Sequence, residues 1–191
     1  MKTTIANIIT ASIATKQALL ADDAMLNSIA KSVDVITSAF KNGKKILFCG
    51  NGGSAADAQH LAAEFSGRFY KDRHALPAEA LHVNTSYLTA VANDYSFDVV
   101  YSRMVTGIGV KGDVLIGIST SGNSTNIINA INAAKEKEMF TIGFTGVAGG
   151  NMKELCDLLI NVPSSDTPRI QECHILVGHI ICELVEKAYF G

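Results

Sequence analysis

Residues 45–65 read KILFCGNGGSAADAQHLAAEF, and this stretch decides the fold. It begins with a continuous apolar run, Ile46–Cys49, which is typical of a strand buried on both faces of a parallel sheet. The glycine-rich segment Gly50–Gly53 follows, and residues 55–65 then have the composition of a helix. A strand, a tight loop and a helix in this order predict the first unit of an α/β fold.

The glycine-rich loop is also a candidate ligand contact. Its glycines allow a ligand close to the backbone, and its N–H groups lie where a helix begins. The loop has neither the GK[ST] ending of a P-loop nor the GxGxxG spacing of a dinucleotide site. A tight turn with Ser54 as a helix cap explains the same residues. Asn51, Gly52 and Gly53 are therefore ligand candidates, and both interpretations stay open.

Four more continuous apolar runs follow along the chain, and helix-like stretches separate them. The expected strands are 81–83, 114–118, 140–144 and 158–162, and the expected helices are 97–106, 125–137, 151–155 and 169–189. Alternating strands and helices predict a doubly wound α/β fold, a three-layer αβα sandwich on a five-stranded parallel sheet. Such folds bind ligands at the carboxyl ends of their strands.

The first 41 residues carry two apolar stripes at helical spacing. The stripes are Ile5, Ile8, Ile9, Ile13 and Leu20, and then Leu26, Ile29, Val33, Ile36 and Phe40. Asp22 and Asp23 interrupt the pattern and can cap the second helix. We expect one domain, 1–191, in which a helical hairpin (1–41) precedes the doubly wound core (45–191). The stripes fit two roles equally, covering the core of their own chain or reaching a partner subunit.

Composition narrows the class of protein. With 48% hydrophobic and 18% charged residues the chain is not disordered, and a net charge of −2 disfavours a broad nucleic-acid surface. The N-terminal apolar run is interrupted by Thr, Asn and Ser, unlike a signal peptide, and no segment approaches the roughly 18 unbroken apolar residues of a membrane span. The 4 cysteines form no CxxC pair, and they resemble small core residues of a protein in a reducing compartment. We expect a cytoplasmic protein without nucleic-acid or membrane partners.

A second polar loop follows the strand expected at 114–118. Ser119, Thr120, Ser121 and Ser124 place four hydroxyls where a strand leads into a helix. Hydroxyl and backbone N–H donors in such a loop can hold a phosphate, helped by the dipole of the next helix. Ser and Thr are also ordinary loop and cap residues. Because two such loops lie at the carboxyl ends of strands in one sheet, we favour phosphate binding.

Two helices carry the remaining polar candidates. His60 and Glu64 lie four residues apart on one helix face, which suits either an ion pair or a metal or acid–base site. The last helix carries Gln171, His174 and His179 in an apolar stretch. His174 resembles a core histidine, and Gln171 lies roughly 12 Å along the axis from His179. Elsewhere, Asn93 and Asp94 are two polar groups that we expect beside the ligand cleft at the carboxyl ends of the strands.

Together these motifs resemble one family. The sequence 49–60 (CGNGGSAADAQH), then Glu64, 67–69 (GRF), 92–94 (AND), 118–124 (ISTSGNS) and 169–172 (RIQE) resemble the phosphoheptose isomerases of the sugar-isomerase (SIS) domain group. The resemblance runs nearly from end to end. It implies an αβα sandwich, usually a homotetramer, that converts sedoheptulose 7-phosphate to D-glycero-D-manno-heptose 7-phosphate for lipopolysaccharide.

The resemblance also assigns roles. It implies that His60, Glu64, Gln171 and His179 bind Zn²⁺, against the spacing argument on the last helix. It implies that the sugar phosphate is held by Asn51, Gly52, Gly53, Glu64, Asn93, Asp94, Ser119, Thr120, Ser121, Ser124 and Gln171. If Gln171 and His179 meet at one ion, either both extend almost fully or a neighbouring subunit supplies one of them. We therefore expect active sites at or near subunit interfaces.

The isomerisation implied by the resemblance passes through an enediol and needs an acid and a base. Glu64 is the expected base at one carbon and His179 its acid–base partner, with zinc polarising the carbonyl. A zinc-bound carboxylate is a weaker base, so either Glu64 leaves the metal or His179 transfers most of the proton. Two rival readings are a non-catalytic SIS protein that associates with the replication initiator and a sugar-phosphate-sensing regulator. The presence of both Glu64 and His179 favours the enzyme.

Overall fold

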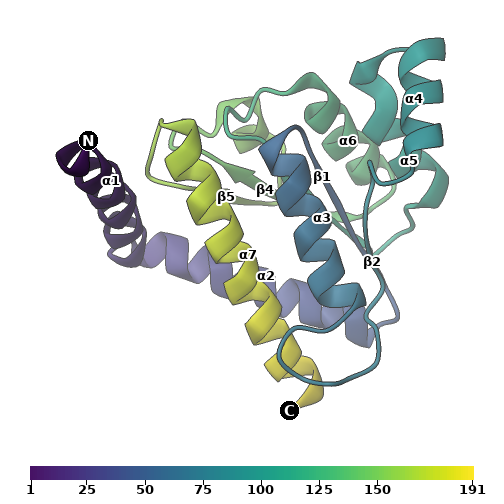
Figure 1. Ribbon diagram of the computed structural model, residues 1–191. Coiled ribbons are helices and arrows are strands. Elements are labelled where there is room, and N and C mark those ends of the chain that lie inside the picture. The colour runs from purple at the N-terminus through teal and green to yellow at the C-terminus, as the bar shows by residue number, and fades with distance from the viewer.

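The computed structural model describes residues 1–191 and is built on five parallel strands (Figure 1). In the order β2-β1-β3-β4-β5, the strands are β2 (Ala78–Ala80), β1 (Ile46–Gly50), β3 (Val114–Ile118), β4 (Phe140–Thr145) and β5 (Leu158–Asn161). Ile46 pairs with Val114, and Val114 pairs with Phe140. The predicted five-stranded parallel sheet is confirmed, and its order places the two polar loops on adjacent strands, β1 and β3.

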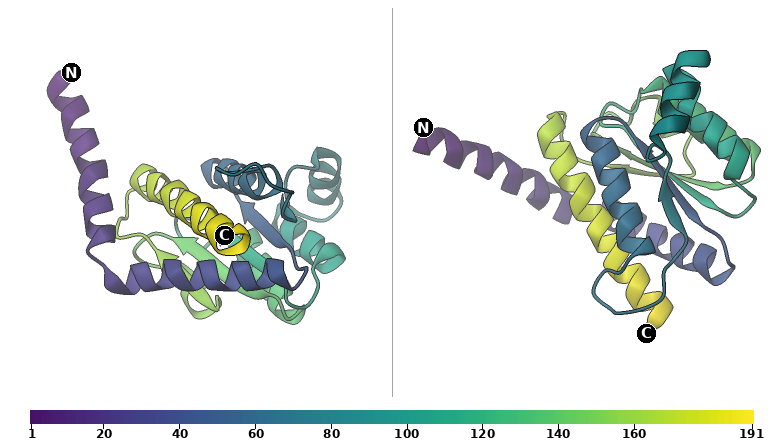
Figure 2. Two further views of the ribbon diagram at one scale, coloured as in Figure 1. Left: turned by 90° about the horizontal axis from the view of Figure 1, so that it is seen from below. Right: turned by 45° about the vertical axis from the view of Figure 1, so that its right-hand side comes forward.

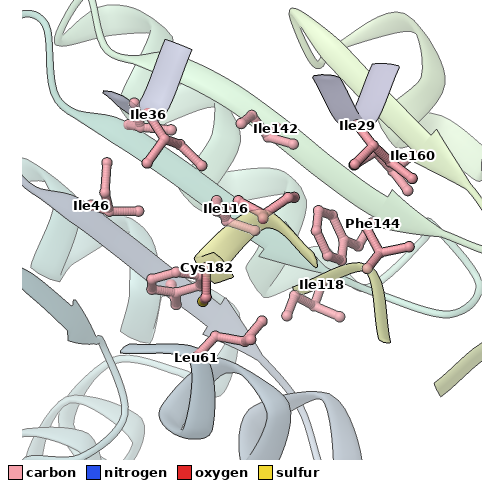
Figure 3. Packing of buried hydrophobic residues seen from close by; sticks show 14 of the residues in the cluster. Ile29, Ile36, Ile46, Leu61, Ile116, Ile118, Ile142, Phe144, Ile160 and Cys182 are labelled. Atoms are coloured by element: carbon pink, nitrogen blue, oxygen red, sulfur yellow. The ribbon is translucent and has the colours of Figure 1, made fainter. Parts of the chain in front are cut away.

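Helices cover both faces of the sheet. On one face lie α2 (Asp23–Lys41), α3 (Gly53–Ser66) and α7 (Thr167–Phe190); on the other lie α4 (Thr85–Asp94), α5 (Val100–Ile108) and α6 (Thr125–Glu136). Along β1, Ile46 and Phe48 join the first core, while Leu47 and Cys49 join the second. Figure 3 shows the first core, with Leu61 of α3 and Cys182 of α7 beside the sheet. Burial on both faces explains why the strands are continuously apolar.

The two N-terminal helices behave differently. Asp22 caps α2 by accepting a hydrogen bond from Met25 N at 3.0 Å, as predicted, and the α2 stripe except Leu26 packs into the first core. Helix α1 (Lys2–Leu20) instead projects from the body (Figure 2), and its one buried residue is Leu19. Its four isoleucines are each about half exposed: Ile5 50%, Ile8 53%, Ile9 55% and Ile13 50%. The second stripe thus covers its own chain, whereas the first is left uncovered.

Several predicted boundaries are wrong. The strand expected at 81–83 is a turn, and the edge strand β2 is Ala78–Ala80, because its place is set by pairing with Ile46–Phe48 of β1 alone. Helix α4 was not predicted. Residues 97–106 divide into a 3₁₀ turn, Phe97–Val99, and α5, while 150–154 form a second 3₁₀ turn. The first residue outside α3 is Gly52, so Ser54 is not its cap.

None of the helices combines the length and apolarity that a bilayer crossing requires. All four cysteines are unpaired, and Cys49, Cys173 and Cys182 are buried in the two cores. The expectation that they serve as small core residues is confirmed for these three, while Cys156 is only partly buried.

Candidate active site

The parallel packing of α3 against α7 creates the polar cluster of the site. The two helices approach closely at Gly178, where a Cβ atom would lie 2.5 Å from Leu61 Cδ1. Real Cβ contacts are essentially never so short, so a larger residue at 178 would require Leu61 to shift. The contact sets the two helices in register, so that His60 and Glu64 of α3 face His179 of α7 on the outer side of the helix layer.

In this cluster the ligand atoms of His60, Glu64 and His179 all lie within 4.8 Å of one another. His60 Nε2 is 3.0 Å from Glu64 Oε1 and 3.0 Å from His179 Nε2. Two imidazole nitrogens and a carboxylate oxygen that converge in this way match the donor set of a catalytic zinc site, which keeps one position open. The side chains present therefore fit the ion that the sequence analysis implied.

Asp57 is a neighbour of the cluster that the sequence analysis missed. It lies three residues before His60 on the same face of α3, and its Oδ2 is buried without a hydrogen-bond partner. Burial raises the pKa of Asp57 above its usual value, and the nearby His60 lowers it in part. A carboxylate at i−3 from a candidate ligand was the available signal, because outer carboxylates commonly orient metal-binding histidines.

Gln171 lies apart from the other three predicted ligands. Its side chain sits against the start of α3, where a Cβ atom on Gly53 would lie 2.7 Å from Gln171 Nε2 and 2.9 Å from Oε1. Along α7, eight residues or roughly 12 Å separate it from His179. A single chain thus brings together His60, Glu64 and His179, and places Gln171 at the glycine-rich loop.

The serine hydroxyls of the loop after β3 contact one another. Ser119 Oγ lies 3.0 Å from Ser124 Oγ and 3.4 Å from Ser121 Oγ. The loop that carries Gly149 packs closely against it. A Cβ atom on Gly122, whose φ is 67°, would lie 2.1 Å from Gly149 O. Beside it is a cavity of about 210 Å³ lined by Thr120, Ser121, Gly146, Val147, Ala148, Ser164, Ser165, Thr167 and Ile170. The hydroxyls of 164, 165 and 167 were missed, since they come from a separate loop after β5.

The glycine-rich loop is held by two polar contacts. Tyr101 donates a hydrogen bond of 2.6 Å to Gly50 O at the end of β1. The side-chain amides of Asn51 and Asn126 exchange two hydrogen bonds of 2.9 Å each. Asn126 belongs to the first turn of α6, so this pair ties the loop after β1 to the loop after β3.

The other candidates divide into exposed and buried groups. Asn93 and Asp94 are exposed at the end of α4, where Asn93 Nδ2 donates to Asp94 Oδ1 at 3.0 Å, and neither contacts the α3–α7 cluster. His174 is fully buried, with Nε2 3.0 Å from Thr145 O, and burial lowers its pKa to about 4. It is the core histidine that the sequence predicted.

Known proteins are similar to this chain in both sequence and fold. Residues 8–146 match the family model described as SIS domain, and the chain belongs to that family. It is 54% identical to a phosphoheptose isomerase of Clostridium acetobutylicum over 191 residues, 100% of this chain and 97% of that one. Within the SIS domain family the chain belongs to the phosphoheptose isomerases.

Two solved structures agree with that assignment. Phosphoheptose isomerase GmhA from Neisseria gonorrhoeae superposes with a TM-score of 0.92 at 43% identity, covering 97% of this chain and 98% of that one. A phosphoheptose isomerase from Francisella tularensis also gives a TM-score of 0.92, at 34% identity, covering 96% of this chain and 97% of that one. The N-terminal helices and the doubly wound core are therefore shared across nearly the whole chain.

Proposed function

We propose that this protein interconverts sedoheptulose 7-phosphate and D-glycero-D-manno-heptose 7-phosphate, the first step toward the ADP- or GDP-heptose precursors of lipopolysaccharide. Membership of the phosphoheptose isomerases makes it a sugar-phosphate isomerase. The observation that carries the proposal is the convergence of His60, Glu64 and His179 within 4.8 Å. A non-catalytic relative that associates with the replication initiator, or a sugar-phosphate sensor, has no need of such a cluster, so we do not favour either.

The reaction moves a proton between C1 and C2 of the sugar, through an enediol. Glu64 takes the proton from one carbon, and His179 exchanges a proton with the partly formed oxyanion or the adjoining carbon. The two side chains suit these roles because they approach one point from different helices, and the substrate can bind beside that point. A Zn²⁺ ion held by His60, Glu64 and His179 would supply Lewis-acid polarisation of the sugar carbonyl.

The substrate phosphate binds at the hydroxyl loop, to Ser119, Thr120, Ser121 and Ser124. Support comes from the clustered hydroxyls and from the adjoining cavity, which adds three more. Asn51, Gly52 and Gly53 of the glycine-rich loop, with Asn93 and Asp94 of α4, bind the sugar hydroxyls. No cationic side chain lines this cavity, so backbone N–H groups and the N-terminus of α6 balance the phosphate charge.

The working form is a homotetramer with shared sites. Helix α1 presents four half-exposed isoleucines, which a neighbouring subunit would cover. Gln171, which is remote from the cluster of its own chain, completes the cluster of that neighbour and contacts its substrate. The enzyme works in the cytoplasm, where unpaired cysteines such as these persist.

Purified protein assayed with sedoheptulose 7-phosphate tests this function. In zinc-containing buffer we expect turnover, which a chelator abolishes and added Zn²⁺ restores; chelator already saturated with Zn²⁺ is the control. Absence of turnover in zinc buffer would contradict the isomerase assignment. Turnover that survives complete removal of metal would contradict the zinc site alone.

A further inference from the structure

A buried ion pair lies beneath the polar cluster and takes no part in the chemistry described above. Arg73 and Glu186 are 3.1 Å apart, with side chains only 4% and 3% exposed. Arg73 belongs to the loop that follows α3, and Glu186 belongs to the last turns of α7, around which that loop curls (Figure 1). A buried charge pair is costly unless its remaining hydrogen-bonding groups find partners, and here they do.

Glu186 holds the loop by its backbone. Its carboxylate accepts hydrogen bonds from the N–H groups of Phe69 (3.2 Å), Tyr70 (2.9 Å) and Lys71 (2.9 Å), besides the bond from Arg73 Nε. Burial raises the pKa of Glu186, but these donors outweigh burial and leave the pKa below its usual value, so the carboxylate is charged. Three consecutive amides on one carboxylate fix the path of the loop.

Arg73 holds the end of α3. Nη2 donates to Glu64 O at 2.8 Å, and Nη1 donates to Phe65 O at 2.7 Å and Gly67 O at 2.9 Å. These carbonyls belong to the last turn of α3 and the residue after it, which have no partner within the helix. The guanidinium therefore caps the helical turn that carries Glu64.

The Arg73–Glu186 pair, which we call the clamp, is also connected to His179 in two ways. Glu186 is seven residues after His179, about two turns along α7, so both side chains lie on one face of that helix. The loop that Glu186 holds also carries Phe69, whose ring centroid is 5.8 Å from that of His179. One ion pair thus connects the turn of Glu64, the helix of His179 and the ring packed against His179.

We infer that Arg73 and Glu186 are positioning residues, which keep Glu64 and His179 in the arrangement that binds the metal and reacts with substrate. This inference rests on the proposed function. Groups outside the ligand shell that orient ligands typically change metal affinity or activity by about 10- to 100-fold when mutated. Because the clamp contacts both the helical turn of Glu64 and the loop packed against His179, it sets the separation of these two side chains.

Two substitutions test the inference. Glu186→Gln keeps the shape and removes the charge that three amides and Arg73 share, while Arg73→Lys keeps the charge and loses the fork that caps α3. We expect both variants to bind Zn²⁺ about 10- to 100-fold more weakly in chelator competition. We also expect an altered visible absorption spectrum for the Co²⁺-substituted protein, and a kcat that falls more than KM rises. Arg73→Lys keeps the test open if Glu186→Gln does not fold.

Asp113→Asn is the matched control. Asp113 is a buried carboxylate with three donors, Lys45 N, Lys45 Nζ and Val110 N, none of them on α3, α7 or the clamped loop. It should lower the melting temperature without changing Zn²⁺ affinity or the Co²⁺ spectrum. Clamp variants that fold and keep wild-type affinity and spectrum, or that change them no more than Asp113→Asn does, would overturn the inference. A wild-type protein that binds no metal would contradict the proposed zinc site, and this inference with it, whereas wild type that binds metal beside unaffected clamp variants would overturn the inference alone, so the two failures are distinguishable.

Discussion

At Glu64 the carboxylate, whose Oε1 is 3.0 Å from His60 Nε2, has two proposed roles, as metal ligand and as base. Glu64→Gln keeps the volume and removes the charge. Activity should fall by roughly 10²–10⁴, the usual contribution of a general base. The reason is that an amide cannot accept the proton and binds zinc more weakly than a carboxylate does. Steady-state kinetics measure the loss, and the melting temperature of the metal-free protein checks the fold. A variant that keeps more than half of the activity would return the pair to a simple helix-surface ion pair.

His174 makes stability depend on pH. Its pKa is lowered by burial to about 4, whereas the unfolded chain titrates near 6.5. The unfolded state therefore binds more protons between these values, so stability is fully present above about pH 6.5 and is lost as the pH falls toward 4. The contribution is about 3 kcal/mol at most.

Urea unfolding of wild type and His174→Gln at pH 7 and pH 5, at one protein concentration, measures this contribution. Glutamine can still donate to Thr145 O but does not titrate. We expect the wild type to lose more stability than the variant over this interval. Equal losses would mean that His174 takes up no proton on unfolding.

Residue spacing predicted only part of the site. The four-residue interval on a helix placed His60 and Glu64 together, as the structure has them. It could not add His179, because that contact spans 119 positions and depends on how α3 packs on α7. Nor could it place Gln171, whose position against Gly53 likewise depends on how α3 packs on α7.

Among the strands, those buried on both faces were predictable, and the edge strand β2 was not. Strands β1, β3 and β4 are almost wholly buried, so continuous apolar runs marked them. Strand β2 pairs with one neighbour and has one buried residue, Ala80, which gives no such signal. Helix α4 likewise buries only Val91. The hydroxyl loop was found because residue type, more than packing, identifies it.

That loop carries a prediction of its own. Ser121→Ala together with Ser124→Ala removes two hydroxyls from the proposed phosphate site. KM should rise with a smaller effect on kcat, because phosphate is bound equally in the ground state and the transition state. Initial rates over a range of sedoheptulose 7-phosphate concentrations measure both constants, with Thr106→Ala, at an exposed position of α5, as the control. An unchanged KM would place the phosphate elsewhere.

For the whole molecule, the question is which chains build one site. We expect inactive Glu64→Gln subunits, refolded together with inactive Gln171→Ala subunits, to recover activity at about a quarter of their sites under random assembly. Those sites combine wild-type Glu64 from one chain with wild-type Gln171 from the next. Activity of the mixture before and after refolding measures the recovery.

A second mixture is the control. Glu64 and His179 belong to one cluster of one chain, so Glu64→Gln mixed with His179→Ala should remain inactive. If the first mixture also stays inactive while mixed oligomers form, Gln171 serves its own chain. If the second recovers, the cluster seen in the single chain is not the working site.

The parallel pairing of α3 with α7 also governs when the enzyme can begin to work. A ribosome delivers α3 long before α7, since 119 positions separate His60 from His179. Until α7 arrives, the first core lacks Cys173, Val177, Ile181 and the other side chains that this helix contributes. The nascent chain is then both inactive and in need of protection from aggregation. Sealing of the first core and completion of the His60–Glu64–His179 cluster are accordingly a single late event in the life of each newly made molecule.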